Sequence, residues 1–288
     1  MKPNRDKLVK RTGWILLFFA VGLFCLQFGY LFLHAKIQVG YIDNRLFYII
    51  NSFCMVSLLL AIFLLLKLTR RFKWIGASIV GIFVMIQVVL LFQSNNKVNN
   101  ISSISPDLKH VFTIKENVVS GQAVYYRQYY GIFDRPKEIL PHKIDGEYKV
   151  QWLANDITVF TYKTADNTLQ QYIGTYGDRK TGNSYYYVGA EIHGVWQGRN
   201  HVEVKTSSEG ITVTENGQKE LFSWDNIQQY GTLAIVLKKN NETRWTISLN
   251  ENFVVQADAS KPKKGNISLY KVTMDQNQPV ILQYVASN

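Results

Sequence analysis

Cysteine is nearly absent from this sequence of 288 residues. Its 2 cysteines, Cys25 and Cys54, both lie in apolar stretches near the N-terminus, so the long remainder of the chain has none. That remainder cannot be stabilised by disulfides, and it must rely on an ordinary hydrophobic core, which about 190 residues suffice to form. A cysteine nucleophile and a cysteine-based metal site are excluded there as well.

Recognisable catalytic motifs are also missing. The sequence contains no HExxH, no Gly-x-Ser-x-Gly and no phosphate-binding glycine-rich loop. We therefore predict no catalytic residue, no metal site and no bound cofactor, and we favour a non-enzymatic role. Carboxylates are plentiful, and two of them at a suitable separation are enough for hydrolysis. A membrane-anchored envelope hydrolase that uses carboxylates is therefore the alternative hypothesis.

Three long apolar runs dominate the first third of the chain. They cover residues 14–33, 46–66 and 74–92, and none contains Asp, Glu, Lys or Arg. About 20 residues of helix cross the hydrocarbon layer of a bilayer, and a helix satisfies its own backbone polar groups there. The sequence thus predicts three transmembrane helices. The first run is too long for the core of a cleavable signal peptide and is interpreted as a retained span.

The distribution of basic residues predicts the orientation of these spans. Two basic clusters precede the first span and separate the second from the third: Lys2, Arg5, Lys7, Lys10 and Arg11, then Lys67, Arg70, Arg71 and Lys73. Only Lys36 and Arg45 lie between the first two spans. Because basic loops stay in the cytoplasm, we expect a multi-pass protein of the cell membrane with a cytoplasmic N-terminus and an extracytoplasmic C-terminal part.

The formal net charge of +11 does not indicate nucleic-acid binding. Residues 1–94 hold 11 of the 32 Lys and Arg residues but only 2 of the 21 Asp and Glu residues, a net charge of +9. The rest of the chain carries only +2. Most of the excess positive charge therefore serves membrane orientation, and we predict no nucleic-acid partner.

Three polar residues lie within the spans. Gln27, Asn51 and Gln87 are the candidate intramembrane contacts. Such side chains form hydrogen bonds between helices, either within one bundle or with another membrane subunit. The absence of ionisable residues argues against a self-contained transporter, because ion pathways usually contain them.

The remaining residues divide into a linker and a β domain. We predict a basic cytoplasmic N-terminus over residues 1–13, the transmembrane region over 14–94, a polar linker over 95–107 and an all-β antiparallel extracytoplasmic domain over 108–288. Period-two alternation indicates about 12–14 short strands, and Asn216-Gly217 is typical of a tight hairpin turn. A two-sheet sandwich is the expected architecture.

A small propeller-like arrangement is the alternative fold. The segment KVQWLANDITVFTY, residues 149–162, resembles the inner strands of blades in TolB-type propellers. Those strands usually carry Ser-Pro-Asp-Gly after the tryptophan, whereas this chain has Leu-Ala-Asn-Asp. A partial echo occurs at residues 223–227. The resemblance implies a blade-like repeat of β sheets.

The segment 174–198 is the candidate recognition surface. It is rich in glycine and large aromatics, and Tyr, Trp and Arg supply many binding hot spots. The candidate residues are Asp178 and Arg179 at the expected turn tip, with Tyr185, Tyr187 and Trp196. The alternative is a hairpin loop whose aromatic side chains pack on the sheet.

These features together predict a binding protein of the cell envelope. We expect the extracytoplasmic β domain to bind or sense a partner or ligand, as an accessory subunit of a larger membrane complex for transport or signalling. The expected partners are the lipid bilayer, a membrane protein and a cell-envelope ligand. A disulfide-free exported domain favours a bacterial envelope.

Overall fold

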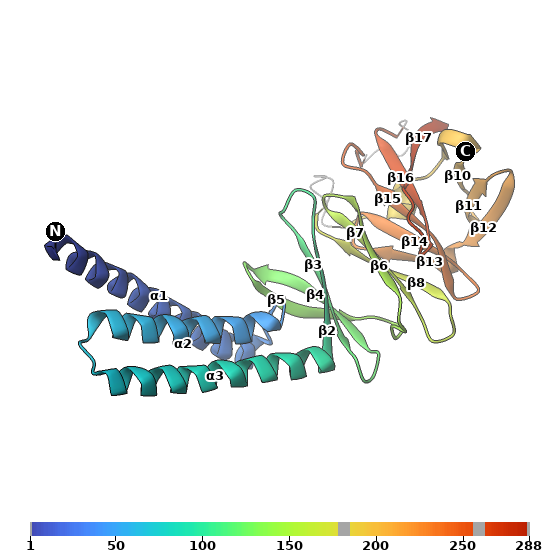
Figure 1. The fold of residues 1–288 in the computed structure, drawn as a ribbon. Coiled ribbons are helices and arrows are strands. Elements are labelled where there is room, and N and C mark those ends of the chain that lie inside the picture. The colour runs from blue at the N-terminus through green and yellow to red at the C-terminus, as the bar shows by residue number, and fades with distance from the viewer. Residues whose placement is uncertain (1, 178–184, 256–262, 287–288) are drawn as a thin grey trace. The chain divides into compact units, whose positions relative to one another are not determined.

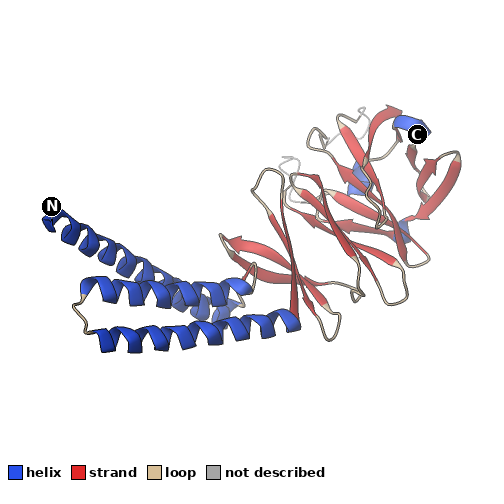
Figure 2. Ribbon diagram, viewed as in Figure 1, coloured by secondary structure: helices blue, strands red, loops and turns tan. Residues whose placement is uncertain are grey.

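The computed structural model describes residues 2–177, 185–255 and 263–286. The chain begins with three long helices, and the remainder is almost entirely β structure (Figure 1, Figure 2). The helices are α1 (Lys2–Ile37), α2 (Arg45–Leu65) and α3 (Arg70–Lys97). All three are long and apolar enough to cross a membrane. This confirms the prediction of three apolar helices.

Two compact units make up the chain. One unit comprises residues 1–102 and 113–139, and the other comprises residues 103–112 and 140–288. The first unit contains the helices and most of a five-stranded antiparallel sheet in the order β1-β5-β4-β3-β2. Its strands are β1 (Gly40–Tyr41), β2 (Val98–Ile104), β3 (Val111–Asn117), β4 (Ala123–Tyr130) and β5 (Phe133–Ile139).

Residues 95–107 differ from the expected polar linker. α3 continues to Lys97, and β2 starts at the next residue, Val98. The polar side chains of this stretch fit an edge strand, because one face of such a strand meets solvent: Asn99 Nδ2 donates to Glu116 Oε2 at 3.1 Å. Polarity alone therefore misidentified a strand as a linker.

The second unit contains two antiparallel sheets, of three and nine strands. The three-stranded sheet comprises β6 (Tyr148–Ala154), β7 (Ile157–Lys163) and β8 (Leu169–Thr175). The nine-stranded sheet has the order β12-β11-β10-β9-β17-β16-β15-β14-β13. Its strands are β9 (Val195–Gln197), β10 (Glu203–Thr206), β11 (Gly210–Glu215), β12 (Gln218–Ser223), β13 (Ile227–Tyr230), β14 (Ala234–Lys239), β15 (Glu242–Leu249), β16 (Asn266–Lys271) and β17 (Val280–Ala286).

The nine-stranded sheet curls around its own core into a nearly closed barrel. β12, at one edge of the sheet, contacts β14, which is the neighbour of the other edge strand. Its core includes Trp196, Phe222, Trp245 and Leu269. Antiparallel pairing confirms the all-β prediction. In the described part of the chain, no sheet has the four strands of a propeller blade.

A layer of glutamines joins the two sheets of the second unit. Gln171 Nε2 donates to Thr161 Oγ1 at 2.9 Å, and Gln171 Oε1 accepts a hydrogen bond from Thr246 Oγ1. Tyr270 OH donates to Gln151 Oε1 at 2.9 Å. We call Gln151, Gln170 and Gln171 the amide layer. Its side chains pair with the hydroxyl groups of Thr161, Thr243, Thr246 and Tyr270. Such pairing is the condition for burying polar groups without a large cost.

Candidate functional site: a cavity where the helices meet the sheet

A recess of the first unit lies where its helices meet its sheet. The cavity has a volume of about 660 Å³ and is lined by residues of all three helices and of β1, β2, β3 and β4. Small-molecule sites typically measure about 300–1,000 Å³. Its size and its mixture of aromatic and polar walls make this cavity the candidate functional site.

Aromatic side chains form one wall of the cavity. The ring centroid of Tyr30 lies 4.3 Å from that of Tyr41 and 5.7 Å from that of Phe47. The Tyr41 side chain is buried, and its hydroxyl donates to Gln27 Oε1 at 3.2 Å. Burial, with a smaller contribution from Tyr30, raises the pKa of Tyr41 to about 12. The Tyr41 hydroxyl on this wall is therefore uncharged at neutral pH.

A buried ion pair lies beside this wall. Lys115 Nζ on β3 is 3.0 Å from Asp134 Oδ1 on β5, and the side chains are only 7% and 0% exposed. Lys115 Nζ also donates to the carbonyl oxygen of Tyr41 at 2.6 Å and lies 4.2 Å from the ring centroid of Tyr126. Lysine and aspartate are rarely buried unless paired. Three independent contacts therefore hold this ammonium group in place.

Gly40 makes the close approach of β1 to the ion pair possible. A Cβ atom at this position would lie 2.8 Å from Asp134 Oδ1 and 3.0 Å from Lys115 Nζ. β1 pairs with β5 through Gly40 and Asp134, and through Tyr41 and Phe133. Any larger residue at position 40 would displace either the strand or the ion pair, so the site depends on this glycine.

Burial dominates the electrostatics of the pair. It raises the pKa of Asp134 to about 6, although the nearby Lys115 opposes the shift. It likewise lowers the pKa of Lys115 against the opposing influence of Asp134. Within the described residues, Asp134 Oδ2 has no hydrogen-bond partner. The carboxylate is therefore only half satisfied, and its proton affinity is raised into the range where mild acid protonates it.

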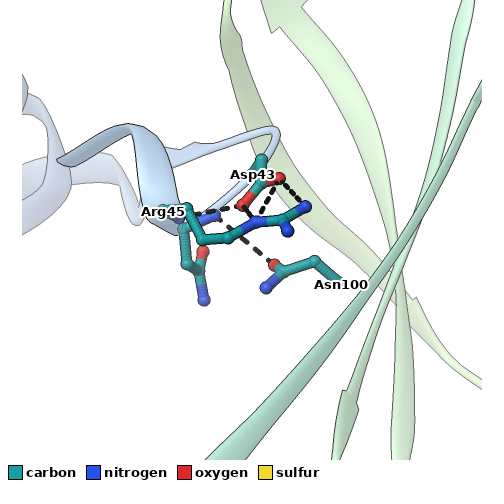
Figure 3. Close-up of polar contacts among 4 residues, drawn as sticks. Asp43, Arg45 and Asn100 are labelled. Atoms are coloured by element: carbon teal, nitrogen blue, oxygen red, sulfur yellow. Dashed lines mark hydrogen bonds and ion pairs between the residues drawn. The ribbon is translucent and has the colours of Figure 1, made fainter. Parts of the chain in front are cut away.

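The loop between α1 and α2 is fixed to β2 at the edge of the cavity (Figure 3). Arg45 Nε donates to both carboxylate oxygens of Asp43, at 2.9 and 2.8 Å. The backbone N–H of Asn44, a cavity residue, donates to Asn100 Oδ1 at 3.5 Å. Burial tends to raise the pKa of Asp43, but the Arg45 hydrogen bonds and charge outweigh it and lower the pKa. Asp43 therefore stays ionised and keeps the loop in place.

The turn between β3 and β4 forms the polar rim. Asn117 Oδ1 accepts hydrogen bonds from the N–H groups of Val119 and Ser120, both at 3.0 Å. The N–H of Val118 donates to the carbonyl oxygen of Lys97 at 3.0 Å, which ties the turn to the end of α3. Val119 at the tip is 89% exposed. The turn thus presents polar side chains to the cavity and an apolar tip to its surroundings.

The polar residues predicted as intramembrane contacts occupy different environments. Gln27 Nε2 donates to the carbonyl oxygen of Phe47 at 2.9 Å, and its Oε1 accepts from Tyr41, so both ends of this amide are used within the first unit. Asn51 is half-buried. Gln87 is buried beside a smaller recess of about 240 Å³ between α2 and α3, and its Oε1 has no partner among the described residues.

Of the five residues of the expected recognition surface, the structure describes Tyr185, Tyr187 and Trp196. Asp178 and Arg179 lie outside the described residues. Tyr185 and Tyr187 are exposed, with ring centroids 5.3 Å apart in an edge-to-face arrangement. Trp196 is instead fully buried in the core of the nine-stranded sheet, and its Nε1 donates to the carbonyl oxygen of Ile192 at 2.8 Å. As a strand residue of β9 it serves packing and is not part of a surface.

Sequence reasoning did not identify Lys115, Asp134 or Gly40. Lys115 lies in a strand of alternating sequence pattern, where a lysine normally faces solvent, and Gly40 lies in the short segment between the first two apolar runs. The weak signal is a lysine that shares a strand with the buried residues Phe112 and Ile114. No cluster of three or more possible metal ligands occurs in the part of the chain that the structure describes.

Comparison of the chain with family models, with curated proteins and with solved structures gives no match. The functional argument therefore depends on the geometry of the site.

Proposed function

We propose that the chain is a multi-pass membrane protein that acts by binding, with its N-terminus in the cytoplasm and its β part outside. Three helices of sufficient length and apolarity support membrane insertion. The basic clusters before α1 and between α2 and α3 support the orientation. In this orientation the α1–α2 loop, the cavity and all sheets lie on the extracytoplasmic side.

The cavity at the helix–sheet junction carries the functional part of the proposal. Its walls combine aromatic side chains from the helix ends with polar groups of the β3–β4 turn. Lys115 is its only Lys or Arg side chain among the described lining residues, and Asp134 balances that charge. This chemistry fits a neutral amphiphile at the outer membrane surface, with a hydroxyl or amide head and an apolar body.

The test is ligand retention by the full chain. Purified in a mild detergent, the protein should bind dioctanoylglycerol in native mass spectrometry, more tightly than a short-chain phosphatidylglycerol. Val124→Trp fills the cavity from β4 and should weaken binding by at least tenfold. Arg127→Trp, at an exposed position of the same strand, is the matched control and should bind normally. Equal binding by both variants would exclude the cavity as the site.

An accessory role in a larger membrane complex is the second part of the proposal. Gln87 Oε1, beside the α2–α3 recess, has no partner in the part of the chain that the structure describes. This supports the role, because a buried amide in a bilayer gains from an interhelical donor. A partner subunit should co-purify from mild detergent. Gln87→Leu should reduce its recovery, whereas Gln93→Leu, at an exposed position of α3, should not. Recovery of the chain alone would contradict this role.

The orientation has its own test. With both natural cysteines replaced, Val119→Cys should react with a membrane-impermeant thiol reagent on intact cells. Lys7→Cys should react only after permeabilisation. The opposite pattern would overturn the orientation and place the cavity on the cytoplasmic side.

A further inference from the structure

We propose that the second unit contains a separate groove that binds neutral, hydroxyl-rich ligands of the sugar class. The groove has a volume of about 590 Å³, within the range of small-molecule sites. It is lined by the β6–β7 turn, by residues 250–252 after β15 and by the segment that leads into β17. This groove shares no described lining residue with the cavity of the first unit. A negative result for the groove would therefore leave the proposal for that cavity intact.

The amide side chains of the groove are held in fixed orientations. Asn250 Nδ2 donates to Asn266 Oδ1, and Ser268 Oγ donates to Asn250 Oδ1 at 2.7 Å. The N–H of Asn266 in turn donates to Asn252 Oδ1 at 3.3 Å. Side chains that are already ordered lose little rotamer entropy when a ligand binds, so this network prepares the groove for polar recognition.

The same network leaves groups that match hydroxyls. Within the described residues, the Nδ2 groups of Asn252 and Asn266 make no hydrogen bond and are donors for a ligand. Asn155 Nδ2 donates to Glu251 Oε1 at 2.9 Å, which leaves Asn155 Oδ1 as an acceptor. A hydroxyl group donates and accepts at once, so neighbouring amide donors and acceptors suit a ring that carries several hydroxyls.

Trp152 supplies a rigid aromatic surface in the groove. Its Nε1 donates to Ser103 Oγ at 2.9 Å, and its ring stacks on Tyr176 with centroids 5.7 Å apart. Tyr176 stacks in turn on His110 at 4.8 Å. The indole is therefore held in place by Ser103 and Tyr176, and it is half-buried. A flat, polarizable ring packs well against the apolar C–H face of a pyranose.

The charges of the groove favour a neutral ligand. Glu251 is the only acidic residue among the described lining residues, and none of them is a lysine or an arginine. Phosphate groups and nucleic acids are usually bound by Arg and Lys, so an anionic ligand does not fit this chemistry. The combination of one aromatic ring, several amides and almost no charge therefore points to uncharged oligosaccharides.

The proposal is tested by calorimetry of the full chain in detergent with chitotetraose, cellotetraose and maltotetraose as probes. At least one should bind with a dissociation constant below about 1 mM. Trp152→Ala should weaken this binding at least tenfold, whereas Trp152→Phe, which keeps a flat ring, should weaken it less. Trp224→Ala, which removes a partly exposed tryptophan outside the groove, should leave it unchanged.

A second variant tests whether binding can be lost while the protein stays folded. Glu251→Ala with Gln278→Ala removes two exposed groove side chains and should weaken binding without changing the melting temperature. Glu209→Ala with Gln276→Ala changes two exposed residues outside the groove and is its control. Failure of all three oligosaccharides to bind, or equal effects of the groove and control variants, would overturn the proposal. So would preferential binding of an uncharged peptide such as tetra-asparagine.

Discussion

Each unit of the molecule contains a buried polar arrangement, and the two arrangements differ in kind. In the first unit, a lysine and an aspartate form an ion pair beneath β1, held by a carbonyl oxygen and an aromatic ring. In the second, the amide layer joins two sheets through neutral hydrogen bonds among glutamine, threonine and tyrosine. Both arrangements are buried, but only the first involves full charges.

The difference lies in how each arrangement responds to change. A buried charge pair loses the hydration of both ions, so removing one partner leaves the other with a large uncompensated cost. A neutral amide that loses one hydrogen bond leaves only an unsatisfied dipole, whose cost is smaller. Protonation can alter the first arrangement but not the second. The ion pair of the first unit should therefore respond more strongly than the amide layer to the loss of one partner and to mild acid.

The largest effect is expected from Lys115→Met. It leaves the Asp134 carboxylate buried without a cation, and we expect a loss of about 3–5 kcal/mol in the free energy of unfolding. Denaturant titration of the full chain in detergent measures the loss, and hydrogen exchange should locate it in β3–β5. Lys115→Met with Asp134→Leu should recover much of it. Lys238→Met, which removes a half-buried lysine bonded to Gln228, should cost far less.

The pH response of Asp134 is the next largest effect. Its folded pKa of about 6 lies above the ordinary value of 3.8, so between these pH values the folded protein binds the proton more tightly than the unfolded chain. The contribution to stability is full below about pH 4 and is lost as the pH rises through 6. Compared with Asp134→Asn, the wild type should gain on the order of 1–3 kcal/mol between pH 7 and pH 4.

Thermal melting of both proteins across this pH range measures the difference. A wild-type curve that runs parallel to that of the asparagine variant would show that the folded pKa of Asp134 is not raised. Hydrogen exchange in β15 and β16, next to the amide layer, should not follow this titration.

A smaller loss is expected from Gln171→Leu in the second unit. The hydroxyls of Thr161 and Thr246 lose their buried partner, and an unsatisfied hydroxyl costs about 1–3 kcal/mol. Hydrogen exchange should rise in β7, β8 and β15 and stay constant in β3–β5. Gln283→Leu, at an exposed position of β17, is the control. A loss equal to that of Lys115→Met would remove the proposed distinction between the ion pair and the amide layer.

The smallest effect is expected from Lys271→Ala. Lys271 and Glu215 form an exposed ion pair, with side chains 53% and 30% accessible. Exposed pairs contribute about 0–1 kcal/mol, because water and salt screen them. The melting temperature should barely change, and added salt should abolish any difference in melting temperature between the variant and the wild type. A loss above about 2 kcal/mol would show that exposure alone does not separate weak ion pairs from strong ones.

Local features of the fold were readable from the sequence. Apolar length predicted three helices, although α1 extends beyond the expected span to Ile37. Asn216-Gly217 predicted a hairpin, and both residues have the positive φ angles, 51° and 77°, that such a turn requires. These features depend on neighbouring residues, so their pattern is visible without the fold.

The candidate site depends on contacts between distant residues and could not be read in the same way. β1 pairs Gly40 with Asp134, and the Lys115 side chain reaches Tyr41 across 74 positions of the chain. Alternation places a side chain on one face of a strand but does not say what will cover that face. Trp196 shows the same limit, because its place in a glycine-rich segment concealed its role in a core.

The direct passage from α3 into β2 has a mechanical consequence. No residue separates Lys97 from Val98, and the Val118–Lys97 hydrogen bond clamps the neighbouring turn to the same point. A flexible linker would let α3 rotate without moving the sheet, whereas here the helix continues directly into the strand. We therefore expect any rotation or tilt of α3 to displace β2, the edge strand of the five-stranded sheet. The wall of the cavity, which includes Val98 of β2, should move with it.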